Sequence, residues 1–219
     1  MAASIVSITG LQNLPNLQGF YADWNGLKSV NLSGLTNLAF VDISDCDVPG
    51  TSIPSLTTVN LTGCTSLQQL RLDDSEFSGG IPNLSGLTSL SLIDFDQSGI
   101  SGVVDLTGIP ALADLDFFGN AALTSIIIAD TQPITDFNAF DCGLTQTAVD
   151  DILVVLSNNG LSNGYVDVSG GTSAIPSATG LAAKTALEGN GWTVNTNAPV
   201  TTTTTTTLGP TTTTTTTTI

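Results

Sequence analysis

The chain has 219 residues, 41% of them hydrophobic, and its 19 acidic residues outnumber 3 basic ones for a formal net charge of −16. Phosphate backbones and anionic lipid surfaces repel a chain of this charge, so the composition argues against nucleic acid as a partner. The chain has no histidine, and its three cysteines form no CxxC spacing, so we expect no metal site and no cofactor.

The N-terminal residues, MAASIVSITG, show neither the basic region nor the long apolar run of a secretory signal. No stretch approaches the roughly 20 apolar residues that a membrane-spanning helix needs. We therefore expect no membrane insertion. If Met1 is the natural start, the chain is made without a secretory signal and reaches an extracellular site only after release from the cell.

A segment of the form LxxLxLxxN recurs about every 22 residues, with Asn, Cys or Ser at the last position. The copies are LQGFYADWN from Leu17, LAFVDISDC from Leu38, LQQLRLDDS from Leu67, LSLIDFDQS from Leu90, LADLDFFGN from Leu112 and ITDFNAFDC from Ile134. One longer interval contains an insertion around residues 47–54. The alternation in LxL predicts a short strand whose apolar side chains point inward.

A second short motif recurs half a period away from the first. Its copies are LKSVNLSGL from Leu27, LTTVNLTGC from Leu56, PNLSGL from Pro82, SGVVDLTGI from Ser101 and LTSIIIADT from Leu123. Each repeat is therefore expected to hold two short strands, one on each side. Stacked repeats bury the apolar rows that a single repeat leaves exposed, which predicts a mostly β solenoid shaped as a flattened, right-handed tube.

The position that ends each copy of the first motif is small and can form hydrogen bonds. It is filled by Asn25, Cys46, Ser75, Ser98, Asn120 and Cys142. Such a side chain can stabilise a turn whose backbone polar groups enter the interior. Cys64 takes the equivalent corner of the second motif. We therefore interpret the cysteines as buried structural residues instead of redox or metal-binding ones.

The quoted LxxLxLxx segments, over residues of roughly 10 to 145, resemble the leucine-rich-repeat family. The resemblance implies an irregular leucine-rich repeat with parallel strands on two sides, which we assign to residues 1–145. The mixture of Asn, Cys and Ser at the turn and the insertion depart from the most regular members, and they leave the curvature open.

After Cys142 the pattern changes to that of an α/β C-terminal cap, which we assign to residues 146–198. In TAVDDILVVLSNNG, apolar residues at Val149, Ile152, Leu153 and Leu156 predict an amphipathic helix that follows Thr147 and ends before Gly160. A strand at Tyr165, a second helix over about 177–188 and a strand in GWTVNTN from Gly191 complete the unit.

Residues 199–219 form an extended threonine tail, in which seven threonines, LGP, eight threonines and Ile219 follow Val200. Fully extended, the tail could span about 60 Å. Three interpretations stay open: a disordered or O-glycosylated stalk, a flexible linker, or a β-segment that pairs with copies of itself or with the edge of another chain.

The closing segment, SGGTSAIPSATGLAAKTALEGNGWTV, and the threonine tract together resemble virion structural proteins of tailed bacteriophages. The resemblance covers the last 60 residues. It implies a location on the virion or an extracellular surface, as a fibre, a tail component or a capsid decoration, with other copies of itself or other virion proteins as partners.

The outward positions of the main strands form the candidate binding face. They are Tyr21, Asp42, Arg71, Asp94, Asp116 and Asn138. Asp94 and Asp116 lie on adjacent strands, where they could bind Ca²⁺ or hold a sugar beside the aromatic rings of Tyr21 or Trp24. The alternative is a solvated acidic face. The opposite face carries Asn31, Asn60, Asn83, Asp105 and Ile127, a polar row with possible amide hydrogen bonds along the stack.

Without histidine, and with few and scattered basic residues, the sequence identifies no catalytic residue and predicts a protein that is not an enzyme. Two hypotheses follow. The first is a structural subunit that assembles through its ends or its tail, and the second is an adhesin that binds host glycan or protein through the strand face. A secreted bacterial surface protein with a glycosylated stalk is a third alternative, which requires that Met1 is not the natural start.

Overall fold

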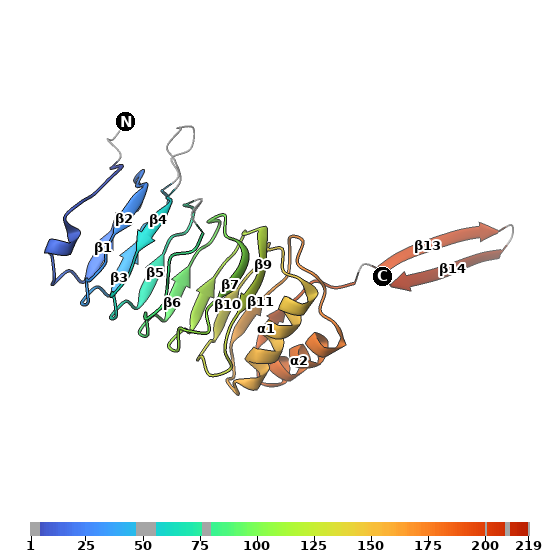
Figure 1. Cartoon of the computed structure of the whole chain (residues 1–219). Coiled ribbons are helices and arrows are strands. Elements are labelled where there is room, and N and C mark those ends of the chain that lie inside the picture. The colour runs from blue at the N-terminus through green and yellow to red at the C-terminus, as the bar shows by residue number, and fades with distance from the viewer. Residues whose placement is uncertain (1–4, 47–55, 76–79, 200, 209–210, 219) are drawn as a thin grey trace.

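The computed structural model describes residues 5–46, 56–75, 80–199, 201–208 and 211–218, so the predicted insertion around 47–54 lies outside the described residues. Its main feature is an eight-stranded parallel sheet in which spatial order follows chain order (Figure 1). The strands are β1 (Gly19–Tyr21), β3 (Phe40–Asp42), β5 (Gln69–Arg71), β6 (Leu92–Asp94), β8 (Asp114–Asp116), β10 (Asp136–Asn138), β11 (Tyr165–Asp167) and β12 (Thr193–Asn195). We call the stretch from one of these strands to the next a repeat. A short 3-10 helix, η1 (Leu11–Asn13), precedes β1.

Further strands lie on the second side of the molecule, as the second motif predicts. The parallel pairs are β2 (Ser29–Asn31) with β4 (Thr58–Asn60), and β7 (Ser101–Asp105) with β9 (Ala122–Ile127). The segment PNLSGL is an exception, because residues 81–84 between β4 and β7 form no strand. Pro82 has no backbone N–H to donate to a strand ladder. The predicted second row of strands is therefore interrupted at this repeat.

The core lies between the two sides. The middle residue of every strand in the large sheet is buried, and these residues are Phe20, Val41, Leu70, Ile93, Leu115, Phe137, Val166 and Val194. Full burial of such a side chain contributes about 1.5–3 kcal/mol, so the stacked apolar rows supply the main stabilisation. Phe95 and Phe117 meet edge to face, with ring centroids 5.6 Å apart.

After each of the first seven main strands, the third residue beyond the strand has a left-handed backbone. These residues are Trp24, Asp45, Asp74, Gln97, Gly119, Asp141 and Gly170. The N–H of each residue in this set up to Asp141 donates to a carbonyl of the following repeat, at 2.8–3.1 Å. The turns therefore add backbone hydrogen bonds between repeats to those that the three-residue main strands form.

The small residues predicted to line the turns do so. Ser98 Oγ donates to the carbonyls of Leu72 (2.6 Å) and Asp96 (3.0 Å), and the Asn120 amide donates to those of Phe95 (2.9 Å) and Phe117 (2.8 Å). All three cysteines are free and buried, and burial raises the pKa of each thiol, for Cys142 to about 12. Cys142 Sγ lies 3.2 Å from the carbonyl oxygen of Phe117. The cysteines are thus buried residues of the turns, as predicted.

Two helices continue the second side toward the C-terminus. Helix α1 (Gln146–Asn158) follows β10 and lies next to β9, and α2 (Ala178–Gly189) lies against α1 (Figure 1). The side chain of Thr145 caps α1 by accepting from the Ala148 N–H, so the helix starts two residues before the predicted Thr147 boundary. Ser177 caps α2 in the same way.

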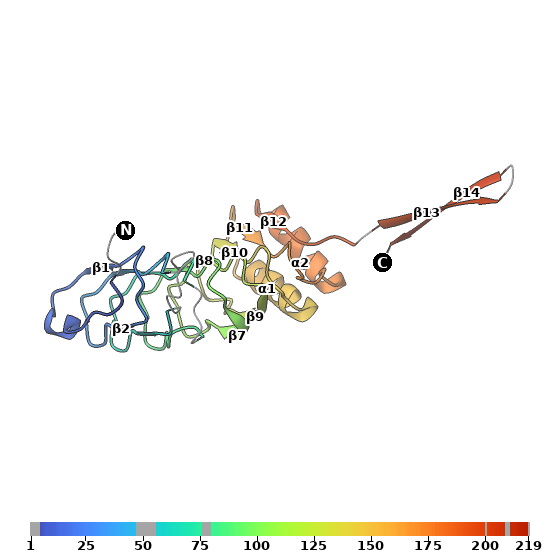
Figure 2. The same ribbon diagram turned by 90° about the horizontal axis from the view of Figure 1, so that it is seen from above.

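The threonine tail is a two-stranded antiparallel hairpin. Strand β13 (Thr201–Leu208) pairs with β14 (Thr211–Thr218), from Thr201 opposite Thr218 to Leu208 opposite Thr211. We call these two strands the threonine ribbon. It projects beyond the C-terminal end of the large sheet (Figure 2). The backbone is extended as predicted, but it folds back on itself, so each arm spans about 26 Å at ~3.3 Å per residue instead of 60 Å in a single line.

Candidate functional site on the strand face

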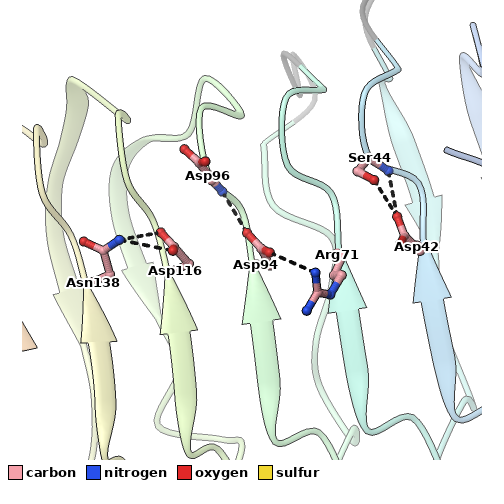
Figure 3. A network of polar contacts seen from close by, with 7 residues as sticks. All are labelled: Asp42, Ser44, Arg71, Asp94, Asp96, Asp116 and Asn138. Atoms are coloured by element: carbon pink, nitrogen blue, oxygen red, sulfur yellow. Dashed lines mark hydrogen bonds and ion pairs between the residues drawn. The ribbon is translucent and has the colours of Figure 1, made fainter. Parts of the chain in front are cut away.

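The register of the large sheet places the six predicted binding residues in one row, and Figure 3 shows the five from Asp42 to Asn138. In order along the sheet they are Tyr21, Asp42, Arg71, Asp94, Asp116 and Asn138. The row continues through Asp167 and Asn195 in the last two strands. The sequence reading missed these two, because the helices of the cap lengthen the interval between strands beyond the period of 22.

Most residues of the row also shape the turn that follows them. Oδ1 of Asp42 accepts from the Ser44 N–H at 3.2 Å, Oδ1 of Asp116 from Phe118 at 2.9 Å, and Oδ1 of Asn138 from Phe140 at 3.1 Å. A side-chain oxygen that accepts from the backbone two residues later forms an Asx turn. One acceptor atom of each residue is therefore already used by the chain itself.

The second side uses the same device. The Oδ1 atoms of Asn31, Asn60, Asn83 and Asp105 accept from the backbone N–H two residues later, at 2.9–3.1 Å. The amide hydrogen bonding suggested along this row therefore connects each side chain to its own turn. Ile127 ends the row as an exposed apolar residue.

Neighbouring residues of the main row also pair with one another. Nη1 of Arg71 lies 3.7 Å from Oδ2 of Asp94, and the Asn138 amide donates to both carboxylate oxygens of Asp116 at 3.1 Å. Asn195 donates to Oδ2 of Asp167 at 2.9 Å. Three neighbouring pairs of the row thus satisfy part of each other's charge or hydrogen-bonding capacity.

A second acidic row lies beside it and was missed by the sequence reading. Asp73 lies two residues after Arg71, the last residue of β5, and Asp96 lies two residues after Asp94, the last residue of the adjacent strand β6. Because side chains two residues apart in extended chain point the same way, the repeat pattern already marks both positions as outward. Burial, then the charges of neighbouring aspartates, raise the pKa of Asp73 to about 6 and that of Asp96 to about 7. Among the described residues, Oδ1 of each is buried with no hydrogen-bond partner. These two carboxyls are therefore the most perturbed on the face.

Burial also raises the pKa of Asp94, Asp114 and Asp136, with repulsion from neighbouring aspartates as the next cause. Asp94 and Asp116 are adjacent in the register, as predicted. The described part of the chain contains no group of three or more His, Cys, Asp or Glu residues arranged to hold a metal ion.

Aromatic side chains lie at two places on this face. Tyr21 and Trp24 are 66% and 72% exposed at the first strand. Phe118 and Phe140 stack in parallel farther along, with centroids 5.7 Å apart and an interplanar angle of 7°. The sequence reading found the first pair and missed the second, whose positions follow the strands directly.

The chain matches no protein-family model, and no curated protein or solved structure is significantly similar to it. In the described residues, no helix is both long and apolar enough to cross a membrane.

Proposed function

We propose that this chain is a leucine-rich-repeat solenoid that serves as a structural or surface component of a bacteriophage virion, without enzymatic activity. In this role it acts as a fibre, tail or capsid decoration protein. The stacked repeats form the body, the α/β unit caps it, and the threonine ribbon joins it to other copies or to other virion proteins.

The strand face supports this proposal through its chemistry. Its carboxylates are engaged in Asx turns and in pairs such as Asp116 with Asn138, and the thiols are buried. A catalytic site needs a base or nucleophile oriented by a second group toward open space. Pairs such as Asp116 with Asn138 link neighbouring repeats, and the Asx turns stabilise the turn within each repeat, as is expected of a rigid spacer.

The threonine ribbon is the observation that carries the assembly role. A two-stranded hairpin is at best marginally stable alone in water, and β13 pairs only with β14 in the described structure. Both outer edges of the ribbon therefore keep backbone groups free for strand addition, and residues 199–219 contain no charged side chain to oppose it. A third strand from another copy satisfies these groups.

An adhesin that binds host glycan or protein through the strand face is the alternative. Exposed Tyr21 and Trp24 favour it, since aromatic faces pack against sugar rings. The internal pairing of the polar row argues against it. An adhesin would lose binding when the face is altered, whereas a structural subunit would lose assembly when the ribbon is altered.

The test compares two variants of the full chain by sedimentation velocity and electron microscopy. Thr204→Pro with Thr205→Pro removes two adjacent N–H groups, one directed at β14 and the other at the outer edge, because antiparallel residues alternate in direction. Asn138→Ala alters the strand face and serves as the control. We expect the proline variant alone to lose the larger assemblies. If assembly survives the prolines, the ribbon is not the assembly element.

A further inference from the structure

The N-terminal end of the molecule differs from the middle in its charge. Residues 1–41 carry one acidic residue, Asp23, and one basic residue, Lys28, so their formal charges cancel. Residues 168–219 carry only Lys184 and Glu188. The whole net charge of −16 therefore lies in residues 42–167. Two copies that approach through this middle part repel each other, whereas contact at an end meets little repulsion.

The same end exposes apolar surface. Leu14 is 50%, Tyr21 66% and Trp24 72% exposed, and the two aromatic residues are the most exposed of the large hydrophobic side chains described. Leu14 also lines a hollow of about 340 Å³ in the segment before β1. Its lining residues are Asn13, Leu14, Pro15, Asn16 and Leu17.

Trp24 is the unusual residue of its position. The equivalent left-handed turn residues of later repeats are Asp, Gln or Gly, namely Asp45, Asp74, Gln97, Gly119, Asp141 and Gly170. Trp24 has φ of 56°, which is uncommon for a bulky side chain and costs stability relative to Asp or Gly. Its ring is mostly exposed and adds little to the core of its own chain. The turn geometry therefore does not explain a tryptophan here.

The backbone at this end is open as well. Strand β1 is the terminal strand of the large sheet. The Ala22 N–H donates to Asp42, and the Gln18 carbonyl accepts from Phe40, so the groups of these even-numbered residues face β3. Because successive residues alternate, the N–H and C=O groups of Gly19 and Tyr21 face the open edge. The second side differs, because there the N-terminal segment bonds the chain beside β2: the Val6 carbonyl accepts from the Lys28 N–H.

We propose that β1 pairs in antiparallel orientation with β1 of a second copy, about a two-fold axis at Phe20. Gly19 of each copy then exchanges backbone hydrogen bonds with Tyr21 of the other. Because the hollow lined by Leu14 and Pro15 precedes β1 and Trp24 follows it, antiparallel pairing brings the Trp24 end of each copy toward the hollow of the other. The contact is reciprocal, as a two-fold interface requires, and it joins the two eight-stranded sheets into one.

The N-terminal edge of the sheet exposes several large apolar side chains for such a contact, and the C-terminal edge exposes fewer. Near β12, the one large hydrophobic side chain described as exposed is Leu181, on α2. The threonine ribbon also leaves the molecule at that end, opposite the N-terminal edge (Figure 1). A dimer joined at β1 therefore directs its two ribbons outward in opposite directions. The contact does not involve the threonine ribbon, so its test is independent of the test of the proposed function.

The test uses the full chain that carries Thr204→Pro and Thr205→Pro, so that ribbon pairing does not obscure the contact. We expect this chain to sediment as a dimer, and we expect Trp24→Asp in the same background to weaken dimerisation at least about tenfold, as for loss of a central aromatic contact. Asp is the residue of the equivalent turns at Asp45 and Asp74, so the variant should fold, with an unchanged or higher thermal midpoint. Leu181→Asp is the matched control and should leave the dimer intact.

Amide hydrogen exchange gives an independent readout. The Tyr21 N–H should exchange more slowly in the dimer than in the Trp24→Asp variant, while the Val166 N–H in β11 should be unaffected. A monomer in the proline background overturns the proposal. Dissociation by Leu181→Asp, or assemblies that grow beyond the dimer, would also overturn it in favour of head-to-tail stacking of β1 on β12.

Discussion

Asn120 shows how one buried side chain holds neighbouring repeats together. It is 1% exposed, its amide donates to the carbonyls of Phe95 and Phe117, and its Oδ1 accepts from the Ile100 N–H at 2.8 Å. The type and position of this residue followed from the repeat pattern alone. The sequence reading did not find Gln132, which does the same on the second side by donating to Leu106 and Ile109. Gln132 lies just outside the quoted copies of the second motif, so the motif does not mark it.

We expect Asn120→Ala to lower the free energy of unfolding by about 3 kcal/mol, because it leaves buried backbone groups without partners. Asn60→Ala is the matched control, since the Asn60 side chain is exposed and bonds one backbone N–H of its own turn. The control should cost about 0.5–1 kcal/mol. Urea denaturation measures both, and equal losses would contradict the turn role assigned to Asn120.

The carboxyl of Asp96 predicts how stability changes with pH. Burial and neighbouring aspartates raise its pKa from 3.8 to about 7, so between these values the folded state binds more protons than the unfolded state. Stability therefore falls as pH rises through this window. We expect Asp96→Asn to raise the urea midpoint at about pH 8 and to change it little at about pH 4, where the carboxyl is protonated in the folded state.

Asp105→Asn is the control for this prediction. Hydrogen bonds from Thr107 lower the pKa of Asp105. The ionised Asp105 carboxylate therefore stabilises the folded state, and this stabilisation is lost when the pH falls through the lowered pKa. The Asn side chain keeps the acceptor, so the midpoint should change little at neutral pH. If Asp96→Asn fails to stabilise the chain above pH 7, the carboxyl is not held in an unfavourable site.

At the scale of elements, the main strands could be predicted because their inward residues repeat with a fixed period. No strand forms at Pro82 because proline lacks the backbone N–H that a strand donates. The repeat pattern compares only side-chain types and does not take this donor into account. The ribbon was missed because two threonine runs have no apolar alternation to set a register. The pairing of Leu208 with Thr211 leaves two residues between the strands, and the interruption at LGP was the available hairpin signal.

The segment that joins β10 to α1 approaches the backbone of residues 121–123 closely at Gly143. A Cβ atom there would lie 2.5 Å from the Ala121 carbonyl oxygen and 3.4 Å from that of Leu123. We expect Gly143→Ala to cost about 2–3 kcal/mol, as backbone must move to make room. Gly108→Ala is the control, since a Cβ there meets nothing within 4 Å. Thermal unfolding of both variants checks this, and a neutral Gly143→Ala would show that α1 can shift freely.

At the scale of the whole molecule, charge and exposed backbone are separated along the axis of the sheet. The acidic stack occupies the middle, and the neutral ends carry the open strand β1 and the threonine ribbon. The repeat pattern predicted Asp94 and Asp116 side by side on one face, whereas Asp73 and Asp96, which follow adjacent strands of the same face, were missed. This arrangement favours contacts at the ends and keeps the sides of neighbouring molecules apart.

The most direct test of this account is native mass spectrometry, with electron microscopy, of the full chain beside a chain that ends at Ala198. We predict that the full chain forms assemblies larger than a dimer and that the shortened chain stops at the dimer joined through β1. Identical mass distributions for the two chains would show that the threonine ribbon does not assemble the protein, and would leave binding of a foreign partner by the strand face as the better account.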